Sequence, residues 1–158
     1  MRLFTYMNHL YFSLTAIALY LAATGLIGWR LLGRDHPYQP PRILALWLVF
    51  VGMLLHAWLL YDGIFSQPGL NLAFFNALVL TSWTVIALLL LSSVTKPVEN
   101  LGLVLLPVAA LTLALEASYP SPNFMRPAVG WVIKIHVLIS MLAYSLLTLA
   151  SVQAILLA

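Results

Sequence analysis

The chain has 158 residues, of which 63% are hydrophobic and only 7% are charged, a composition far outside the range of soluble domains. Its net charge of +3 is small and scattered along the chain, which argues against a nucleic-acid-binding patch. The sequence contains no cysteine, which excludes disulfides, thiol chemistry, structural zinc and a Cys-x-x-Cys-His haem attachment site.

Five apolar segments are long enough to cross a bilayer, whose hydrocarbon core requires about 20 helical residues. They extend roughly over residues 10–32, 43–64, 72–94, 98–117 and 129–157. Almost all of the chain lies in these spans or in short connections between them. The sequence therefore predicts an all-α, polytopic transmembrane helix bundle that forms a single domain over residues 1–158.

The first span resembles a secretory signal peptide at one point, because Ala22-Ala23-Thr24 is an acceptable cleavage site. The apolar run continues beyond this site, however, and its basic residues follow it instead of preceding it. We therefore expect an uncleaved helix. The connections after spans one and three hold four of the seven Lys and Arg residues, a small bias that favours an N-terminus outside the membrane. Within the fourth span, Pro107 predicts a kink.

The last span carries a narrow face of small and polar residues around one histidine. At about 100° per residue, these positions lie close to one line along the helix: His136, Ser140, Ala143, Leu147, Ala150 and Ala154. Such a face is typical of helix–helix contacts in membranes, so we expect protein against it and not lipid. The chain ends in an apolar run without a charged flank, which predicts that it is the N-terminal part of a longer protein.

Two of the four histidines, His56 and His136, lie inside spans. The face of the second span that carries His56 also carries Ala45, Val49, Gly52 and Gly63. Counted from the predicted outer ends of their helices at about 1.5 Å per residue, the two imidazoles lie at similar depth. This geometry suits two axial ligands of one haem or a polar pair. The alternative is a simple hydrogen bond from each imidazole to a neighbouring helix, with Ser140 one turn from His136.

The remaining polar residues indicate structural roles. His9 and His36 lie at span ends, where we expect solvation, and Glu116 is expected to pair with Lys134 or Arg126 rather than to relay protons. Capping or interhelical hydrogen bonds are expected for Asn71 and Asn76. The sequence has no nucleophile beside a base, no phosphate loop and no carboxylate pair, so we do not expect an enzyme.

Three stretches together resemble a known family: GLNLAFFNALVLTSW at 69–83, KPVENLGLVLLPVAAL at 96–111 and KIHVLISMLAYSLLTLASVQA at 134–154. They are similar to the YpjD/HemX-like branch of the cytochrome c assembly (CcsA/CcmC) membrane protein superfamily. The most specific part is the His-x3-Ser-x3-Tyr pattern at His136, Ser140 and Tyr144. This resemblance implies a bacterial inner-membrane protein of about eight spans that binds haem through histidines and passes it outward.

On this resemblance, His56 and His136 are expected to contact haem and to bind its iron. The Trp-Gly-x-x-Trp-x-Trp-Asp signature of the haem-delivery members does not occur in these 158 residues. Either it lies on a further part of the protein or this branch lacks it, so the resemblance alone does not imply haem delivery to apocytochrome c. The alternative function is a non-catalytic membrane partner or regulator, acting on haem biosynthesis or on another membrane protein. A b-type electron-transfer subunit would normally place histidine pairs at two depths, whereas only one depth is seen.

Overall fold

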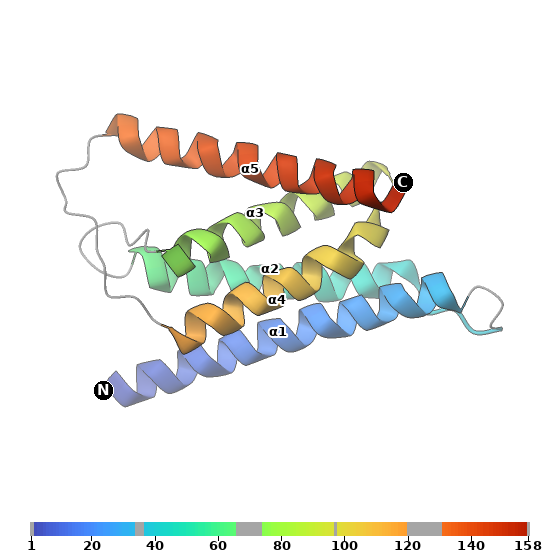
Figure 1. The fold of residues 1–158 in the computed structure, drawn as a ribbon. Helices are drawn as coiled ribbons and strands as arrows, with labels where there is room; N and C mark the ends of the chain where they lie inside the picture. The colour runs from blue at the N-terminus through green and yellow to red at the C-terminus, as the bar shows by residue number, and fades with distance from the viewer. Residues whose placement is uncertain (1, 34–36, 66–73, 97, 120–130, 158) are drawn as a thin grey trace.

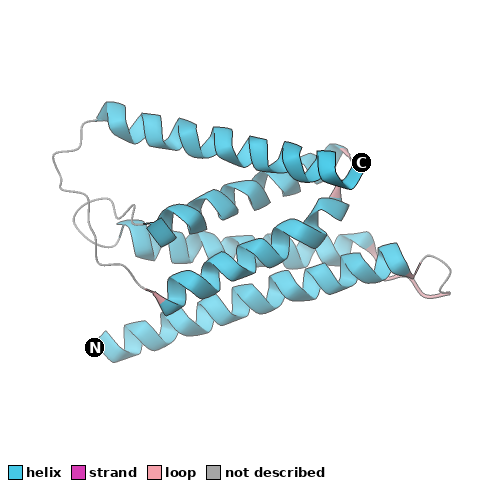
Figure 2. Ribbon diagram, viewed as in Figure 1, coloured by secondary structure: helices cyan, strands magenta, loops and turns pink. Residues whose placement is uncertain are grey.

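The computed structural model is an all-helical bundle, and it describes residues 2–33, 37–65, 74–96, 98–119 and 131–157 (Figure 1). Its elements are α1 (Arg2–Leu32), α2 (Arg42–Phe65), α3 (Phe74–Thr95), the 3-10 turn η1 (Glu99–Leu101), α4 (Gly102–Ser118) and α5 (Trp131–Leu157). No strand occurs in the described part of the chain, as Figure 2 shows. Five helices are long and apolar enough to cross a membrane, which confirms the predicted polytopic bundle.

The observed helices match the predicted spans closely, except at the start of the chain. Helix α1 begins at Arg2, eight residues before the predicted start at residue 10. Helix α2 begins directly after Pro41, whose carbonyl oxygen accepts a hydrogen bond from the N–H of Leu44 at 3.0 Å. Proline is tolerated at a helix start because the first N–H groups there have no helical partner. Pro107 lies inside α4, and the helix continues through it from Gly102 to Ser118.

The packing order of the helices determines which faces are covered. Helix α1 packs against α2 and α4, while α3 packs against α2, α4 and α5. Helix α5 packs mainly on α3 and touches η1, so it lies at the side of the bundle (Figure 1). The largest fully buried apolar side chains are Tyr20, Ile86, Leu106 and Leu113, which come from α1, α3 and α4. The core therefore lies among α1 to α4, and α5 is peripheral.

The small residues of α2 allow α1 to approach closely. A methyl group added at Gly52 would lie 3.0 Å from Cε1 of Tyr20, so glycine leaves the space that the tyrosine ring occupies. Ala45 and Val49, on the same face, are also buried. The predicted small-residue face of α2 is thus an interhelical contact, and it brings Tyr20 to the level of His56.

Candidate functional site

His56 lies at the centre of the bundle, and its side chain has no exposed surface. Its Nδ1 atom is 3.1 Å from the hydroxyl of Tyr20 on α1, and its Nε2 atom is 3.2 Å from the carbonyl oxygen of Val79 on α3. A carbonyl oxygen can only accept, so Nε2 carries the proton and donates it to Val79. Nδ1 therefore accepts from the Tyr20 hydroxyl. Both ring nitrogens are used by the protein itself.

The polar contacts of His56 continue into α3 and α4. The carbonyl oxygen of Val79 also accepts from the Ser82 hydroxyl at 3.0 Å, and Ser82 Oγ lies 2.8 Å from Thr112 Oγ1 on α4. Ser82 and Thr112 are both buried. Each of these groups would be costly to place in hydrocarbon without a partner. The result is a buried polar network that joins α1, α2, α3 and α4.

His136 has the opposite environment. Its side chain is exposed on α5, and it forms no hydrogen bond with any residue that the structure describes. Helix α5 packs on α3 with other residues: Ser145 is fully buried, and Met141 and Leu149 are half-buried. At about 100° per residue, Ser145 is on the opposite side of the helix from His136. His136 therefore points away from the rest of the described bundle.

The small-residue face of α5 is consequently open, which differs from our expectation that protein covers it. Ala143, Leu147, Ala150 and Ala154 are exposed, and Ser140 is half-buried. The physical reason lies on the other side of the helix, where larger side chains fill the space against α3. There the Ser145 hydroxyl lies 3.4 Å from the carbonyl oxygen of Thr81. This role of Ser145 could not be read from the sequence pattern, because Ser145 is one polar residue on a face of large apolar ones.

The structure does not bring His56 and His136 together. His56 bonds to Val79 on one side of α3, and α5 docks beside Thr81, two residues further along and about 200° around that helix. Helix α3 thus separates the two imidazoles. Among the described residues there is also no group of three or more His, Cys, Asp or Glu side chains that could hold a metal ion. The described residues therefore do not form a single site shared by both histidines.

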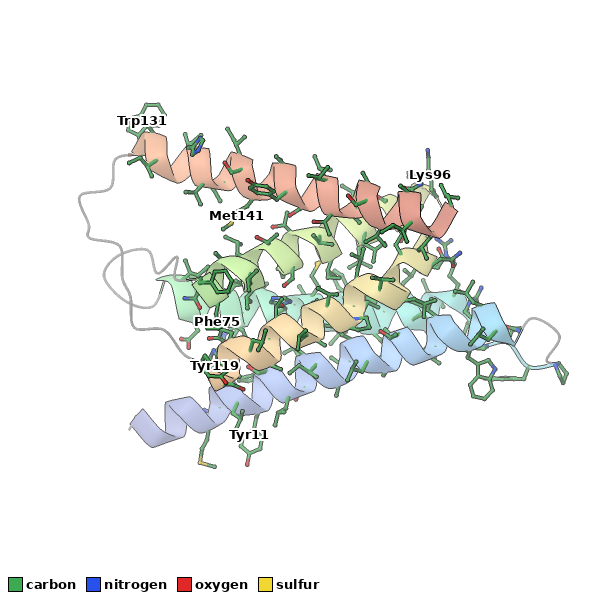
Figure 3. All side chains as sticks on the ribbon, in the orientation of Figure 1. Tyr11, Phe75, Lys96, Tyr119, Trp131 and Met141 are labelled. Atoms are coloured by element: carbon green, nitrogen blue, oxygen red, sulfur yellow. The ribbon has the colours of Figure 1, made fainter. Side chains whose placement is uncertain are left out.

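The start of α3 and the end of α4 meet at the opposite end from the α1–α2 connection. Phe75 stacks on Tyr119 with ring centroids 5.7 Å apart, and Trp131 projects away from the other helices at the start of α5 (Figure 3). His9 on α1 and Asp62 on α2 lie close enough to Glu116 on α4 to interact with it electrostatically.

Several sequence predictions concern the remaining polar residues. Arg126, His36 and Asn71 lie outside the described residues, as does the side chain of Lys134, so the predicted pairing of Glu116 and the predicted solvation of His36 stay predictions. His9 is half-buried near the start of α1, and its predicted solvation stays a prediction. Asn76 is buried on α3, as an interhelical role requires.

Two further polar residues of the core were missed by sequence analysis. Tyr20 is the hydrogen-bond donor to His56, and the Trp83 indole nitrogen donates to the carbonyl oxygen of Met53 at 3.1 Å. Their places in the sequence could have indicated this role. Both aromatic residues lie well inside their spans, whereas aromatic residues that anchor a protein at the membrane interface lie near the span ends.

Comparisons with protein-family models, with curated proteins and with solved structures each gave no match. Any assignment of function must therefore start from the residues and their geometry. These define a multi-pass membrane protein with one enclosed, fully hydrogen-bonded imidazole and one open imidazole on a peripheral helix.

Proposed function

We propose that this chain is a haem-handling membrane protein of the cytochrome c assembly type, and that it contacts haem through His136 and not through His56. The haem part of the proposal is supported by the resemblance of residues 134–154, with His136, Ser140 and Tyr144 in its most specific pattern. The choice of residue is supported by one observation: His136 is exposed on α5 and makes no hydrogen bond with a described residue.

The imidazole of His56 is not suited to bind iron in this packing. Iron needs a nitrogen lone pair, and in the neutral ring the only lone pair is on Nδ1, which accepts from Tyr20. Ligation would break that hydrogen bond and would also require an opening among α1, α2 and α3, because the ring is completely enclosed. We therefore assign His56 a structural role, as the residue that joins these three helices.

His136 fits a ligand better because its ring is accessible. An imidazole within an apolar span is costly unless it has a partner, and no described residue supplies one. Ser140 and Tyr144 follow at intervals of one turn, so hydroxyl groups lie near the same side of the helix. A second axial ligand, where one is used, would come from outside the described residues. Bound haem would be the cargo that the protein passes on.

A non-catalytic membrane partner or regulator is the second candidate function, and a separate observation favours it. The exposed face of α5 carries Ala143, Ala150 and Ala154, whose small side chains let another helix approach closely. On this interpretation, His136 would hydrogen-bond to a polar group of that helix. The two functions differ in whether the purified protein carries haem.

The test is to purify the full-length protein from haem-replete cells and to measure its visible spectrum and haem content. We expect a Soret band in the unsubstituted protein and loss of most of its intensity in the His136→Ala variant. The His56→Gln variant, which retains an amide for hydrogen bonding, should keep its haem. A Leu147→Ala variant on the same exposed face is the matched control and should also keep it.

A colourless unsubstituted protein would contradict the haem-handling function and leave the partner function. A coloured protein that retains full haem content after His136→Ala would instead overturn the choice of His136. Circular dichroism of each variant separates loss of haem from loss of fold.

A further inference from the structure

A polar cavity lies at the end of the bundle where α1 ends and where α2 and η1 begin. Its volume is about 360 Å3. Arg30, Arg42, Glu99 and Asn100 supply its polar lining, and Ile27 and Ala45, both buried, supply an apolar floor. The end of α1 and the start of α2, which supply Arg30 and Arg42, lie at the end of the bundle opposite to the start of the chain (Figure 1). Neither His56 nor His136 lines it, so it is separate from the haem proposal.

Hydrogen bonds hold the two guanidinium groups in place. Arg30 Nη1 donates to the carbonyl oxygen of Pro40 at 2.6 Å, which fastens the α1–α2 connection to the end of α1. Arg42 Nη2 donates to the carbonyl oxygen of Ser93 at 2.6 Å. In addition, Arg42 Nε lies 2.9 Å from Glu99 Oε1, an ion pair between α2 and η1. These contacts fix the position of the cations before any ligand arrives.

The cavity has unused binding capacity for an anion. An arginine has five N–H donors. Hydrogen bonds to described residues engage only Nη1 of Arg30 and Nη2 of Arg42, which also lies 3.5 Å from the Lys96 carbonyl oxygen. Arg42 Nε lies near Glu99 Oε1 without forming a hydrogen bond, and the other N–H groups of both arginines form none in the described part of the chain. Among the described residues that line the cavity, two arginines and one glutamate leave one net positive charge, and Glu99 Oε2 is buried without a hydrogen-bond partner. The Arg42 side chain is 39% exposed and can be reached from outside.

From these observations we infer that the cavity binds the phosphodiester headgroup of an anionic phospholipid. Guanidinium groups match phosphate oxygens in geometry and charge, because their N–H donors form a planar fork. A phosphodiester carries one negative charge, which would balance the net charge of the lining. The shared chemistry would also admit inorganic phosphate, so the position of the cavity must decide the source.

The position favours a lipid. Arg30 lies two residues before the end of the first membrane span, and Arg42 and Glu99 are the first residues of the second and fourth spans. All three therefore lie at the level where headgroups begin. Basic pockets between transmembrane helices at this level bind anionic headgroups. The apolar floor of Ile27 and Ala45 suits the glycerol and upper acyl carbons of a lipid and offers nothing to hydrated inorganic phosphate.

The experiment uses the full-length protein, delipidated in mild detergent, with bound lipid counted by native mass spectrometry. The probes are phosphatidylglycerol, phosphatidylcholine and inorganic phosphate. We expect phosphatidylglycerol to bind at least several-fold more tightly than phosphatidylcholine, and Arg30→Gln to weaken it about tenfold, as for loss of a charge-assisted hydrogen bond. The Arg42→Lys variant, which keeps the charge but loses the fork, should weaken it less.

Lys96→Gln is the matched control. Lys96 is an exposed cation at the same end of the bundle, at the end of α3, and it does not line the cavity. We expect its removal to change phosphatidylglycerol binding by less than about twofold. If Lys96→Gln and Arg30→Gln lowered the affinity for phosphatidylglycerol equally, general surface charge would explain the binding and the proposal would be overturned.

Two other results would also overturn it: equal binding of both lipids, or displacement of phosphatidylglycerol by millimolar inorganic phosphate, which would identify a soluble anion as the ligand. If Arg30→Gln lowers the melting temperature, Arg30→Lys replaces it, because lysine can still donate to the Pro40 carbonyl oxygen. The outcome is independent of haem content, so it cannot be confused with failure of the proposed function.

Discussion

Helices α2 and α5 carry the same kind of face, with small residues around one histidine, but only α2 buries it. On α2, Ala45, Val49, Gly52 and His56 are all buried against neighbouring helices. On α5, the face around His136 is exposed, and the helix packs on α3 with its opposite side. A small-residue face thus shows that close packing is possible at that position. It does not show which chain, or which ligand, covers it.

The difference follows from the neighbours of each helix. Helix α2 contacts both α1 and α3, so that His56 finds a donor on one side and an acceptor on the other. Helix α5 has one main neighbour, α3, and the side chains that fill that contact are larger. The functional consequence is that a hydrogen-bonded histidine stabilises the fold, whereas an open one remains available for binding.

The largest expected effect contrasts the two histidines directly. His56→Ala leaves the Tyr20 hydroxyl and the Val79 carbonyl oxygen with unmet hydrogen-bonding capacity and opens a cavity, so we expect a loss of about 2–4 kcal/mol in the free energy of unfolding. His136→Ala removes an exposed ring and should change that free energy by less than about 0.5 kcal/mol. Reversible unfolding of the full-length protein in mixed micelles measures both. Equal losses would contradict the assignment of different roles.

A smaller effect tests the close approach of α1 and α2. A methyl group at Gly52 would meet the ring of Tyr20 at 3.0 Å, and this ring is buried and hydrogen-bonded, so it cannot move aside freely. We expect Gly52→Ala to lower the free energy of unfolding by about 1 kcal/mol, after its gain in helix propensity is included.

Gly63 provides the control on the same helix. A methyl group there has no atom within 4 Å outside its own helix backbone, so Gly63→Ala should be neutral or raise the free energy of unfolding by up to about 1 kcal/mol. The same unfolding assay distinguishes the two variants. If Gly52→Ala were as stable as Gly63→Ala, the contact between Gly52 and Tyr20 would not limit the packing.

The helices could be predicted from the sequence because length and apolar content alone determine which segments can span a membrane. The burial of His56 could also be predicted, since it lies on a face with Gly52 and Ala45. Its partners could not. Tyr20 and Val79 are 36 and 23 residues away along the chain, and their proximity depends on which helices are neighbours and on their rotation. Hydropathy contains neither kind of information.

The orientation of α5 could not be predicted for a related reason. Its two sides are both suited to packing, one through small residues and one through Met141, Ser145 and Leu149. The sequence shows that either side of α5 could pack against another helix, but it does not show which packing is more stable. The packing energy of each side depends on the shape of the helix that it meets. The Arg30 and Arg42 cavity was missed because it is formed by three elements that are distant in the sequence.

The smallest expected effect concerns the docking of α5 on α3. Because the chain has no cysteine, one introduced cysteine is a unique probe of this contact. Leu149 is half-buried on the α3 side and Ala143 is exposed on the opposite side, so a maleimide should label a Leu149→Cys variant more slowly than an Ala143→Cys variant. Equal rates would mean that α5 does not use the observed face.

Adding Ser145→Ala to the Leu149→Cys variant then measures how much one hydroxyl contributes to this contact. Ser145 donates mainly within its own helix, to the carbonyl oxygen of Met141 at 2.7 Å, and its contact with the Thr81 carbonyl oxygen at 3.4 Å is long. Interhelical hydrogen bonds in membranes contribute about 0.6 kcal/mol on average, so labelling should become faster by about two- to threefold. Ser140→Ala, on the side away from Thr81, should leave the rate unchanged. A tenfold increase from Ser145→Ala would show that α5 is held by this bond and not by apolar packing, and the open face of His136 would then depend on a single hydroxyl group.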